Sequence, residues 1–369
     1  MVSIWEAETF YRKRNIIIIG SGFTGLWTAI SIKEKKPQTS VLVIERNSVP
    51  TGASTRNAGF ACFGSLTEII SDSEKMGWKK TLDLVKMRFD GLKKIQKYFT
   101  DSEIDFDLCG GYEILNNEEP LQKIEEVNAR LKSVTGIEKT YFLNNEKIKE
   151  FGLRKSGFLI ENSIEGSLHS GKLMTKLLEK CYELNIEFIF GTEAESVSET
   201  ENETEIHLSD NISISCEKVI FCTNAFSNKL LKYENIIPAR GQVLLTTPIE
   251  NLKLKGTFHY DEGFYYFRNL GNRVLLGGAR NQDFKTEETT ELSTTEFLQN
   301  HLEEFLKTVI LPNQDFKIEK RWSGIMAMGN EKTPIVKQLS ERQFCAVRLS
   351  GMGVALAPKI GEMVAEMII

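Results

Sequence analysis

Long hydrophobic runs and clusters of basic residues are both absent from this chain. No segment of the 369 residues approaches the roughly 18 consecutive apolar residues of a membrane-spanning helix. The residues before Ile16 are charged and aromatic, unlike a signal sequence. Basic residues are interspersed with acidic ones and the net charge is -5, which excludes a general attraction to nucleic acid. We therefore expect a cytoplasmic protein that has no membrane span and binds no nucleic acid.

Cysteine and histidine are scarce, and their spacing does not suggest a metal site. The four histidines match no zinc-ligand or catalytic-triad pattern, and no Cys-x-x-Cys pair occurs. We expect no metal and six buried free thiols: Cys62, Cys109, Cys181, Cys216, Cys222 and Cys345. Cys62 follows the loop discussed below, but we assign it no function.

The clearest pattern near the start of the chain is a buried strand followed by a glycine-rich turn. Ile16 to Ile19 form an uninterrupted β-branched run, and residues 20–25 read Gly-Ser-Gly-Phe-Thr-Gly. Gly20 permits the turn out of the strand, Gly22 lets the backbone approach a pyrophosphate, and Gly25 allows the next helix to pack closely. This order predicts a nucleotide-binding βαβ unit, with the helix amides directed at the phosphates.

A second strand ending in an acid completes the unit. Val41 to Ile44 is apolar and ends on Glu45, which stands 20 residues after Gly25. A carboxylate in this position accepts hydrogen bonds from ribose hydroxyls and repels a 2′-phosphate. The sequence therefore predicts a dinucleotide with an unphosphorylated adenosine.

The loop at residues 51–60 favours FAD over NAD. It reads Thr-Gly-Ala-Ser-Thr-Arg-Asn-Ala-Gly-Phe, and its small residues, hydroxyls, arginine and amide suit a loop that bends around a second phosphate and a polar ring edge. The same composition would also fit an ordinary solvated loop.

These motifs resemble those of a known family. The segments that carry the resemblance are 20–26, Gly52-Ala53-Ser54, Arg56-Asn57, the strand end at 222–224, Arg240-Gly241-Gln242, and the late segments 321–324 and 349–358. They are similar to the FAD-dependent oxidoreductases that include D-amino acid oxidase, glycine oxidase, sarcosine oxidase and γ-glutamylputrescine oxidoreductase. Asn224 stands where the family has a glycine.

The resemblance implies an α/β fold in which a discontinuous Rossmann-like FAD-binding domain carries an inserted α+β substrate domain with an antiparallel sheet. We assign 1–72, 160–235 and 318–369 to the FAD-binding domain, and 73–159 and 236–317 to the substrate domain. No cysteine occurs at Ile325 or Met326, around the family's covalent attachment site, so we expect noncovalent FAD.

The expected cofactor-binding residues lie in the glycine turn, at the end of the second strand, in the 51–60 loop, at the 222–224 strand end and before the last helix. They are Gly20, Gly22, Phe23, Thr24, Gly25, Glu45, Arg46, Ser54, Thr55, Arg56, Asn57, Ala58, Gly59, Thr223, Asn224, Gly351, Met352, Gly353, Val354 and Ala355.

Family chemistry implies oxidation of a carbon–nitrogen bond in a small amine or amino acid. A hydride passes to flavin N5, water hydrolyses the imine, and oxygen or an electron carrier accepts the electrons. Two carboxylate-binding cations of relatives are missing, since Met326 and Ala355 occupy their places. A buried carboxylate without a partner is costly, so we expect an amine or a modified amino acid rather than a simple α-amino acid.

Candidate substrate contacts come from the segment expected to form antiparallel strands at 258–267 and 273–276, namely Tyr265, Arg268 and Arg280. Both arginines could equally form surface salt bridges, and the aromatic stripe at 264–267 could face a core. Two alternative functions remain open at this stage. One is a 2-hydroxy acid dehydrogenase that passes electrons to a quinone or carrier, and the other is a non-catalytic flavin-binding or redox-sensing protein.

Overall fold

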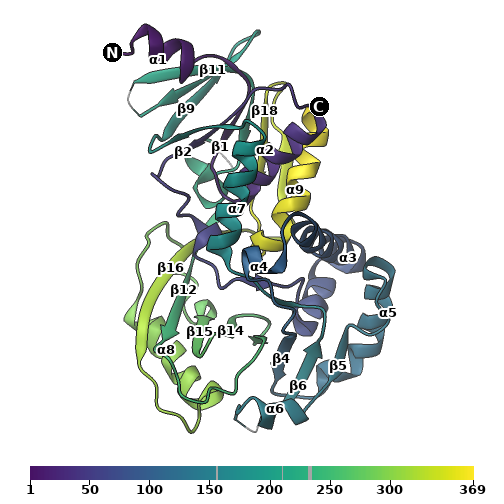
Figure 1. Cartoon of the computed structure of the whole chain (residues 1–369). Helices are drawn as coiled ribbons and strands as arrows, with labels where there is room; N and C mark the ends of the chain where they lie inside the picture. Colours follow the sequence, from purple (N-terminus) through teal and green to yellow (C-terminus); the bar gives the residue numbers. More distant parts are fainter. Residues whose placement is uncertain (155–156, 210, 232–234) are drawn as a thin grey trace. The chain divides into compact units, whose positions relative to one another are not determined.

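The computed structural model describes residues 1–154, 157–209, 211–231 and 235–369 (Figure 1). The chain forms two compact units. The first comprises Met1–Thr55, Gly171–Pro238 and Met326–Ile369, and the second comprises Arg56–Ser170 and Ala239–Ile325. Residues 56–72, 160–170 and 318–325, which we had placed with the FAD-binding domain, thus belong by their contacts to the second unit. The functional division of the chain stays a prediction.

The first unit contains an eight-stranded sheet in the order β17-β18-β11-β1-β2-β8, with the hairpin strands β9 and β10 attached to β11. Ile17 and Ile18 in β1 are fully buried because helices and loops cover both faces of a parallel sheet. The strands are β1 (Arg14–Ile19), β2 (Val41–Glu45), β8 (Glu187–Phe190), β9 (Ala194–Glu199), β10 (Thr204–Leu208), β11 (Ile212–Phe221), β17 (Ile335–Gln338) and β18 (Gln343–Val347). The sequence also predicts a hairpin turn at Asp210-Asn211, of which Asp210 lies outside the described residues.

The helices of this unit are α1 (Ile4–Thr9), α2 (Phe23–Lys35), α7 (Ser170–Glu183) and α9 (Gly353–Ile368). Helices α2 and α9 lie side by side (Figure 1). Their backbones approach closely at Gly361, where an added Cβ would lie 2.6 Å from the carbonyl carbon of Trp27. This contact anchors the last helix against the helix that follows the glycine turn.

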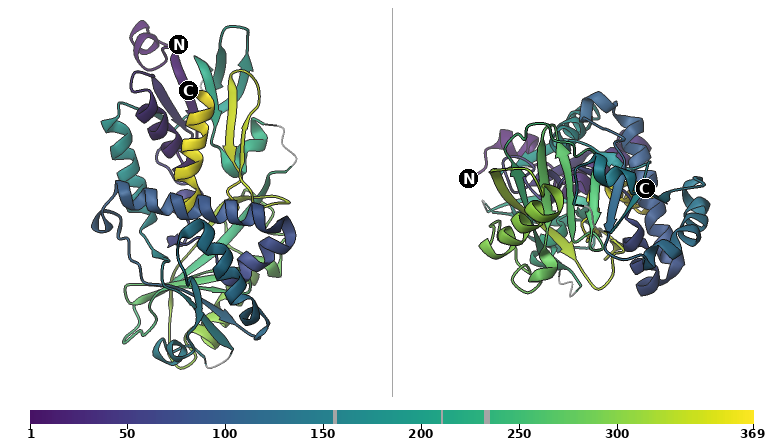
Figure 2. Two further views of the ribbon diagram at one scale, coloured as in Figure 1. Left: turned by 90° about the vertical axis from the view of Figure 1, so that its right-hand side faces the viewer. Right: turned by 90° about the horizontal axis from the view of Figure 1, so that it is seen from below.

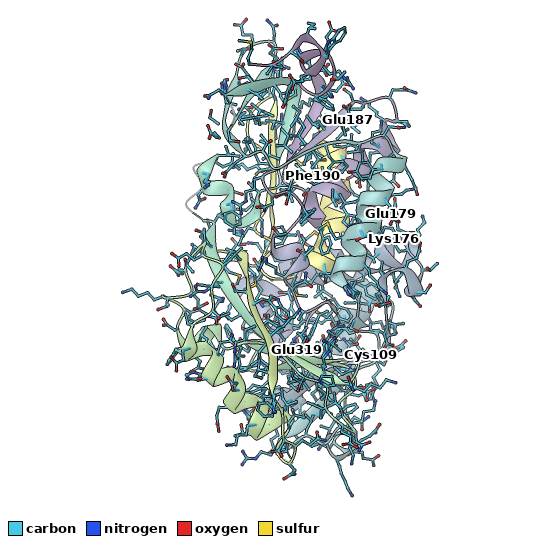
Figure 3. The ribbon with its side chains drawn as sticks, turned by 60° about the vertical axis from the view of Figure 1, so that its left-hand side comes forward. Cys109, Lys176, Glu179, Glu187, Phe190 and Glu319 are labelled. Atoms are coloured by element: carbon cyan, nitrogen blue, oxygen red, sulfur yellow. The ribbon has the colours of Figure 1, made fainter. Side chains whose placement is uncertain are left out.

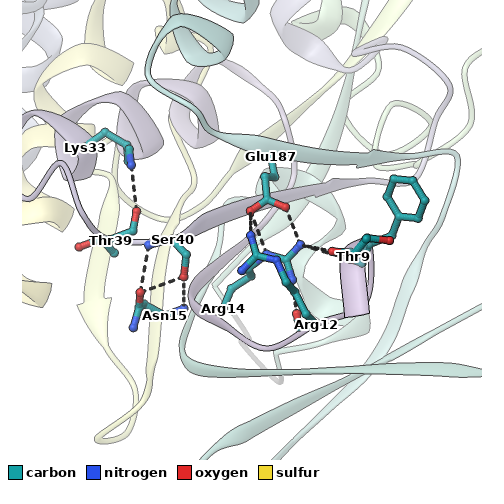
Figure 4. Close-up of polar contacts among 9 residues, drawn as sticks. Thr9, Arg12, Arg14, Asn15, Lys33, Thr39, Ser40 and Glu187 are labelled. Carbon is teal, nitrogen blue, oxygen red and sulfur yellow. Dashed lines mark hydrogen bonds and ion pairs between the residues drawn. The ribbon is translucent and has the colours of Figure 1, made fainter. Parts of the chain in front are cut away.

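A polar cluster ties the N-terminal helix to the edge of the sheet (Figure 4). The buried Arg14 donates to both carboxylate oxygens of Glu187, from Nε at 3.0 Å and from Nη2 at 2.5 Å. Arg14 also donates to the carbonyl oxygen of Thr9 at 2.9 Å, which caps the end of α1. Glu187 and Phe190, at the two ends of β8, are labelled in Figure 3.

The second unit is built on an eight-stranded sheet in the order β16-β12-β15-β14-β13-β4-β6-β5. Neighbouring strands with a described register are antiparallel except β13 and β4, which are parallel. The strands are β4 (Gly111–Leu115), β5 (Tyr141–Leu143), β6 (Phe158–Asn162), β12 (Ile237–Thr246), β13 (Thr257–Tyr260), β14 (Tyr265–Leu270), β15 (Arg273–Gly278) and β16 (Ile318–Met328). A two-stranded sheet pairs β3 (Phe60–Ala61) with β7 (Gly166–Ser167). The strand expected at 258–267 is in fact two strands, because Asp261, Glu262 and Gly263 adopt positive φ and turn the chain.

One face of this sheet packs on α8 (Glu296–Phe305) and holds the apolar core of the unit. The rings of Phe258 and Phe267 stack with centroids 4.8 Å apart, and Tyr265 stacks on Phe305 at 4.6 Å. The other face contacts the chain around Ala58 and Phe60. Figure 2 shows the strands of this sheet from below; one face carries the apolar core and the other contacts Ala58 and Phe60.

The second unit contains four further helices: α3 (Leu66–Tyr98), α4 (Asp101–Ile104), α5 (Ile124–Thr135) and α6 (Glu146–Glu150). Helix α3 is interrupted at Gly77, whose φ of 79° and ψ of 155° are not helical. Within the described ranges, no helix is both long and apolar enough to cross a membrane.

Candidate functional site

The turn between β1 and α2 has a backbone that only glycine permits. Gly20 has a φ of 106°, and an added Cβ would lie 2.8 Å from the carbonyl oxygen of Cys222. A Cβ on Gly25 would lie 2.0 Å from the carbonyl oxygen of Gly20. Gly22 is the N-cap residue of α2 and has no side chain to occupy the space before the helix. Phe23 and Thr24 form the buried first turn of α2.

The start of α2 is in contact with the loop that carries Ser54. The Ser54 hydroxyl accepts a hydrogen bond from the Phe23 amide at 3.0 Å, so the loop that carries Ser54 reaches the helix N-terminus. The Thr55 hydroxyl donates to the carbonyl oxygen of Pro50 at 3.0 Å within the same loop. A helix N-terminus flanked by a serine hydroxyl is suited to anion binding.

Glu45 is held rigidly at the end of β2. One carboxylate oxygen accepts from the amide and hydroxyl of Ser21 at 3.1 and 2.8 Å, and the other accepts from the amide and side chain of Asn47 at 3.1 and 3.2 Å. Two of these bonds come from rotatable side chains, whose places ribose hydroxyls can take. The adjacent Arg46 guanidinium lies over the ring of Phe226, 3.8 Å from its centroid.

Asn224 follows β11 with a φ of 46°. Asparagine tolerates the left-handed region better than most residues, which explains how it replaces the family's glycine here. Its Oδ1 accepts from the amide of Arg348 at 3.2 Å, which joins the ends of β11 and β18. The neighbouring Thr223 hydroxyl lies 2.8 Å from that of Ser227.

The turn before α9 presents unused donors. Ser350 and Gly351 have φ of 49° and 84°, and Met352 caps α9 without any side-chain hydrogen bond. The Ser350 hydroxyl is buried and has no hydrogen-bond partner. The first-turn residues Gly353, Val354 and Ala355 thus start a long helix whose positive dipole end suits a negatively charged group.

The loop that continues from the first unit into the second is fixed by hydrogen bonds. Arg56 donates to the carbonyl oxygen of Ser323 at 3.1 Å and its own carbonyl accepts from Trp322 Nε1 at 3.0 Å. Asn57 Oδ1 accepts from the Gly59 amide at 2.8 Å and from the Ser170 hydroxyl at 2.6 Å. Ala58, in the same loop, packs in the apolar cluster with Val243, Leu245 and Leu275.

Two of the predicted substrate contacts, Tyr265 and Arg268, lie on opposite faces of β14. Tyr265 points into the apolar core against Phe305, and its contact with substrate stays a prediction. The next residue, Tyr266, lies on the other face beside Phe60, with ring centroids 6.0 Å apart. Arg268 shares that face because side chains alternate along a strand.

Arg268 is buried yet poorly satisfied. Its Nη1 donates to the carbonyl oxygen of Gly59 at a long 3.4 Å, and its Nε has no partner. Burial lowers the pKa of the guanidinium, while the more distant Cys109, Asp107 and Asp105 favour its charge. Cys109, labelled in Figure 3, makes a 3.8 Å contact with the Ser167 hydroxyl. No carboxylate within the described residues pairs with Arg268 at ion-pair distance.

His259 and Tyr266 are neighbours on adjacent strands and were not singled out from the sequence. Desolvation lowers the pKa of His259 to about 4, so the ring is neutral, and its Nε2 is buried without a partner. Desolvation raises the pKa of Tyr266 to about 12. Because alternate residues of a strand share a face, the prediction of Arg268 as a substrate contact could have pointed to Tyr266 as well. No sequence signal marks His259.

Two buried glutamates accept hydrogen bonds from residues 63–67, which follow the loop at 51–60. Glu165 Oε1 accepts from the amides of Phe63 and Gly64 at 2.7 and 3.2 Å, and desolvation raises its pKa to about 8. Glu113 accepts from the Ser65 hydroxyl at 2.9 Å and the Thr67 amide at 3.1 Å, and desolvation raises its pKa to about 7. Neither residue belongs to a sequence motif.

Other predicted groups have structural partners. Arg240 Nε and Nη2 bind the two oxygens of buried Glu287, each at 2.8 Å. The six cysteines are free, five of them buried and Cys109 partly so. Among the described residues no cluster of His, Cys, Asp or Glu could hold a metal.

Known proteins resemble this chain over almost its full length. A family model described as FAD dependent oxidoreductase matches residues 15–367. The probable oxidoreductase OrdL of Haemophilus influenzae is 24% identical over 374 residues, covering 96% of this chain and 83% of that protein.

Solved structures share the fold. L-proline dehydrogenase from P. horikoshii superposes with a TM-score of 0.80 at 20% identity, covering 97% of this chain and 93% of the other. Glycine oxidase from Geobacillus kaustophilus gives a TM-score of 0.78 at 17% identity, covering 97% and 95%. The expected α/β architecture is thereby confirmed.

FAD fits the residues present, since the glycine turn, the held Glu45, the uncapped start of α9 and the unpartnered Ser350 hydroxyl are each suited to part of it. The FAD expected from the sequence is confirmed by the family, and the chain belongs to the FAD-dependent oxidoreductases.

Proposed function

We propose that this enzyme oxidises a carbon–nitrogen bond in a modified amino acid or related amine. The names of the two structural neighbours refer to amino acids, proline and glycine. When bound noncovalently, FAD supplies a two-electron acceptor for the hydride leaving the carbon next to nitrogen, after which water hydrolyses the imine and oxygen or a carrier takes the electrons.

The observation that carries the proposal is that the buried Arg268 has no carboxylate partner among the described residues. A buried guanidinium without a carboxylate is costly, and its rigid fork of donors matches a carboxylate. Arg268 supplies the cation that is missing at Met326 and Ala355, where relatives hold the substrate carboxylate. The anchor therefore comes from β14 in this chain.

The neighbouring residues suit an oriented, desolvated substrate. Phe60, Tyr266 and the apolar side chains of β12 and β15 limit water on this face of the sheet. His259 stays neutral near pH 7 and so adds no positive charge that would repel an ammonium group. With the amine held neutral, hydride loss needs no general base from the protein.

The test is an anaerobic screen of the holoenzyme, read as loss of oxidised flavin absorbance. The panel contains N-methyl amino acids, simple α-amino acids, plain amines and 2-hydroxy acids. We expect N-substituted amino acids to bleach the flavin. Bleaching by 2-hydroxy acids alone would assign the dehydrogenase function, and no bleaching by any compound would favour a non-catalytic flavoprotein; either result refutes the proposal.

A variant pair isolates the role of Arg268. Arg268→Met removes charge-assisted hydrogen bonds and should weaken binding of carboxylate-bearing substrates about 10- to 100-fold, while plain amines change little. Arg273→Met is the control, because Arg273 pairs with Glu319 at 3.3 Å on the partly exposed start of β15. Glu319 is labelled in Figure 3.

A further inference from the structure

A second arginine near this face also has no carboxylate partner. Arg280 follows β15, and the preceding Ala279 turns the chain with a φ of 59°. Its guanidinium carbon lies 4.7 Å from the ring centroid of Phe284. Within the parts of the chain that the structure describes, Arg280 makes no ion pair, although it is only partly exposed.

The acidic residues nearest to Arg280 do not neutralise it directly. Glu287 is fully buried and its two oxygens are bound by Arg240, while the Gln242 amide contacts the same oxygens at 3.0 and 3.1 Å. Glu288 is exposed and acts on Arg280 only from beyond ion-pair distance. The charge of Arg280 is therefore available to a ligand.

Other buried arginines of the chain show how unusual this is. Three buried arginines are matched by a carboxylate: Arg14 with Glu187, Arg88 with Glu68, and Arg240 with Glu287. A fourth, Arg348, donates instead to the carbonyl oxygens of Thr333 and Asn235. Burying a guanidinium without such a partner costs free energy. Arg268 in β14 and Arg280 just after β15 both lack a carboxylate partner within the described ranges.

Tyr266 lies between the two arginines. In the β14–β15 register Tyr266 is opposite Gly277 and Arg268 is opposite Leu275. Gly277 makes room for the tyrosine ring, because an added Cβ would lie 2.5 Å from it. Arg280 is three residues beyond Gly277, so along the β14–β15 pair Tyr266 stands between Arg268 and Arg280. Arg280 is five residues after Leu275, at most about 16.5 Å away at about 3.3 Å per residue, and the Cα of Leu275 lies about 5 Å from that of Arg268 across the strand pair, so the two arginine Cα atoms are at most about 22 Å apart.

We propose that Arg268 and Arg280 bind two separate carboxylates of one substrate, with Tyr266 between them. The substrate class is an amino acid whose nitrogen carries a carboxyalkyl group, so that a carboxylate lies on each side of the amine. This inference rests on the proposed function and adds a specificity residue, Arg280, to it. A guanidinium at each end favours a dianion over the matching monoanion.

Binding of non-oxidisable analogues to the holoenzyme tests this without turnover. Oxydiacetate has an ether oxygen in place of the amine and two carboxylates, and methoxyacetate is the matched monocarboxylate. Calorimetric titration should show oxydiacetate, or a homologue with one or two more methylene groups, binding at least about 10-fold more tightly than methoxyacetate. Equal affinities across this series would overturn the inference.

Variants assign the second carboxylate to Arg280. Arg280→Met should lower the affinity for the dicarboxylate about 10- to 100-fold and leave methoxyacetate nearly unchanged, and Arg280→Lys should keep part of the preference. Arg273→Met controls for general loss of positive charge. Equal losses for both ligands in Arg280→Met would contradict the assignment. Flavin content checks that each variant is folded. The comparison of oxydiacetate with methoxyacetate on the wild-type protein does not depend on the variants.

The two proposals can fail separately. If N-methyl amino acids bleach the flavin and dicarboxylates have no advantage, the proposed function stands and the two-carboxylate inference falls. If dicarboxylates bind preferentially but no amine bleaches the flavin, the proposed function falls while the two-arginine anion site remains.

Discussion

The carbonyl oxygen of Gly20 lies 2.0 Å from the place where a Cβ of residue 25 would stand. Helix α2 can therefore start against β1 only if residue 25 has no side chain. The amides that we predict to face the cofactor phosphates are positioned by this close approach of α2 to β1. A methyl group at residue 25 should therefore weaken cofactor binding.

Gly25→Ala should reduce bound FAD and lower the melting temperature. The new methyl group must displace backbone rather than a flexible side chain, which costs about 1–3 kcal/mol or more. The measurement is the ratio of flavin to protein absorbance after purification, together with thermal unfolding. Gly136→Ala, at the C-cap of α5, is the control, because it strains a backbone with φ of 74° where an added Cβ meets nothing within 4 Å and no cofactor contact is predicted. Equal FAD content in both variants would contradict the steric argument.

Stability should fall as pH rises from about 4.5 to 8 through the two buried glutamates. Their pKa values, raised from 4.5 to about 7 for Glu113 and about 8 for Glu165, mean that the folded chain keeps protons that the unfolded chain releases in this interval. Their contribution is fully present below about pH 4.5 and is lost as pH rises through the folded pKa values.

Glu165→Gln should flatten this decline by at most about 1.4 kcal/mol per pH unit, because it removes one titration and keeps an oxygen that can accept from Phe63 and Gly64. Denaturant unfolding at several pH values measures the slope. Glu217→Gln, on an exposed residue that contacts Asn15 at 2.8 Å, serves as control. An unchanged slope in Glu165→Gln would show that Glu165 does not titrate in this range.

Adjacent tyrosines on β14 should respond differently to the same substitution. Tyr266→Phe should weaken oxydiacetate binding about 3- to 10-fold, because it removes a hydroxyl from the face with the two arginines. Tyr265→Phe should change this affinity less than about twofold, since its ring stacks on Phe305 in the core. Calorimetric titration compares the two variants, and a larger effect at Tyr265 would reverse the assignment of the two faces.

The fold class and the cofactor could be predicted because their signals are local. Strand, glycine turn, helix and Glu45 follow one another within a short segment, and each residue type has a steric or charge reason to be there. The orientation of Tyr265 could not be predicted, for an equally physical reason. A run of four aromatic residues has no polar alternation, so the sequence does not reveal which side of the strand is the core.

Glu113 and Glu165 could not be predicted from local patterns. They reach residues 63–67 from β4 and from the turn before β7, and only the tertiary structure brings these segments together. The unpaired state of Arg268 and Arg280 is likewise a property of the fold, because the sequence contains abundant glutamates that could have been their partners.

Asn224 has a broader consequence for detecting distant relatives. The chain after β11 requires a left-handed backbone at residue 224, where φ is 46°. Asparagine can adopt this conformation, and its side-chain oxygen also accepts a hydrogen bond from the Arg348 amide. A search profile that requires glycine at this position therefore misses chains in which asparagine adopts the same backbone conformation. Profiles that admit asparagine there, coupled to a residue after the last strand of the sheet, should retrieve flavoproteins that glycine-only patterns overlook.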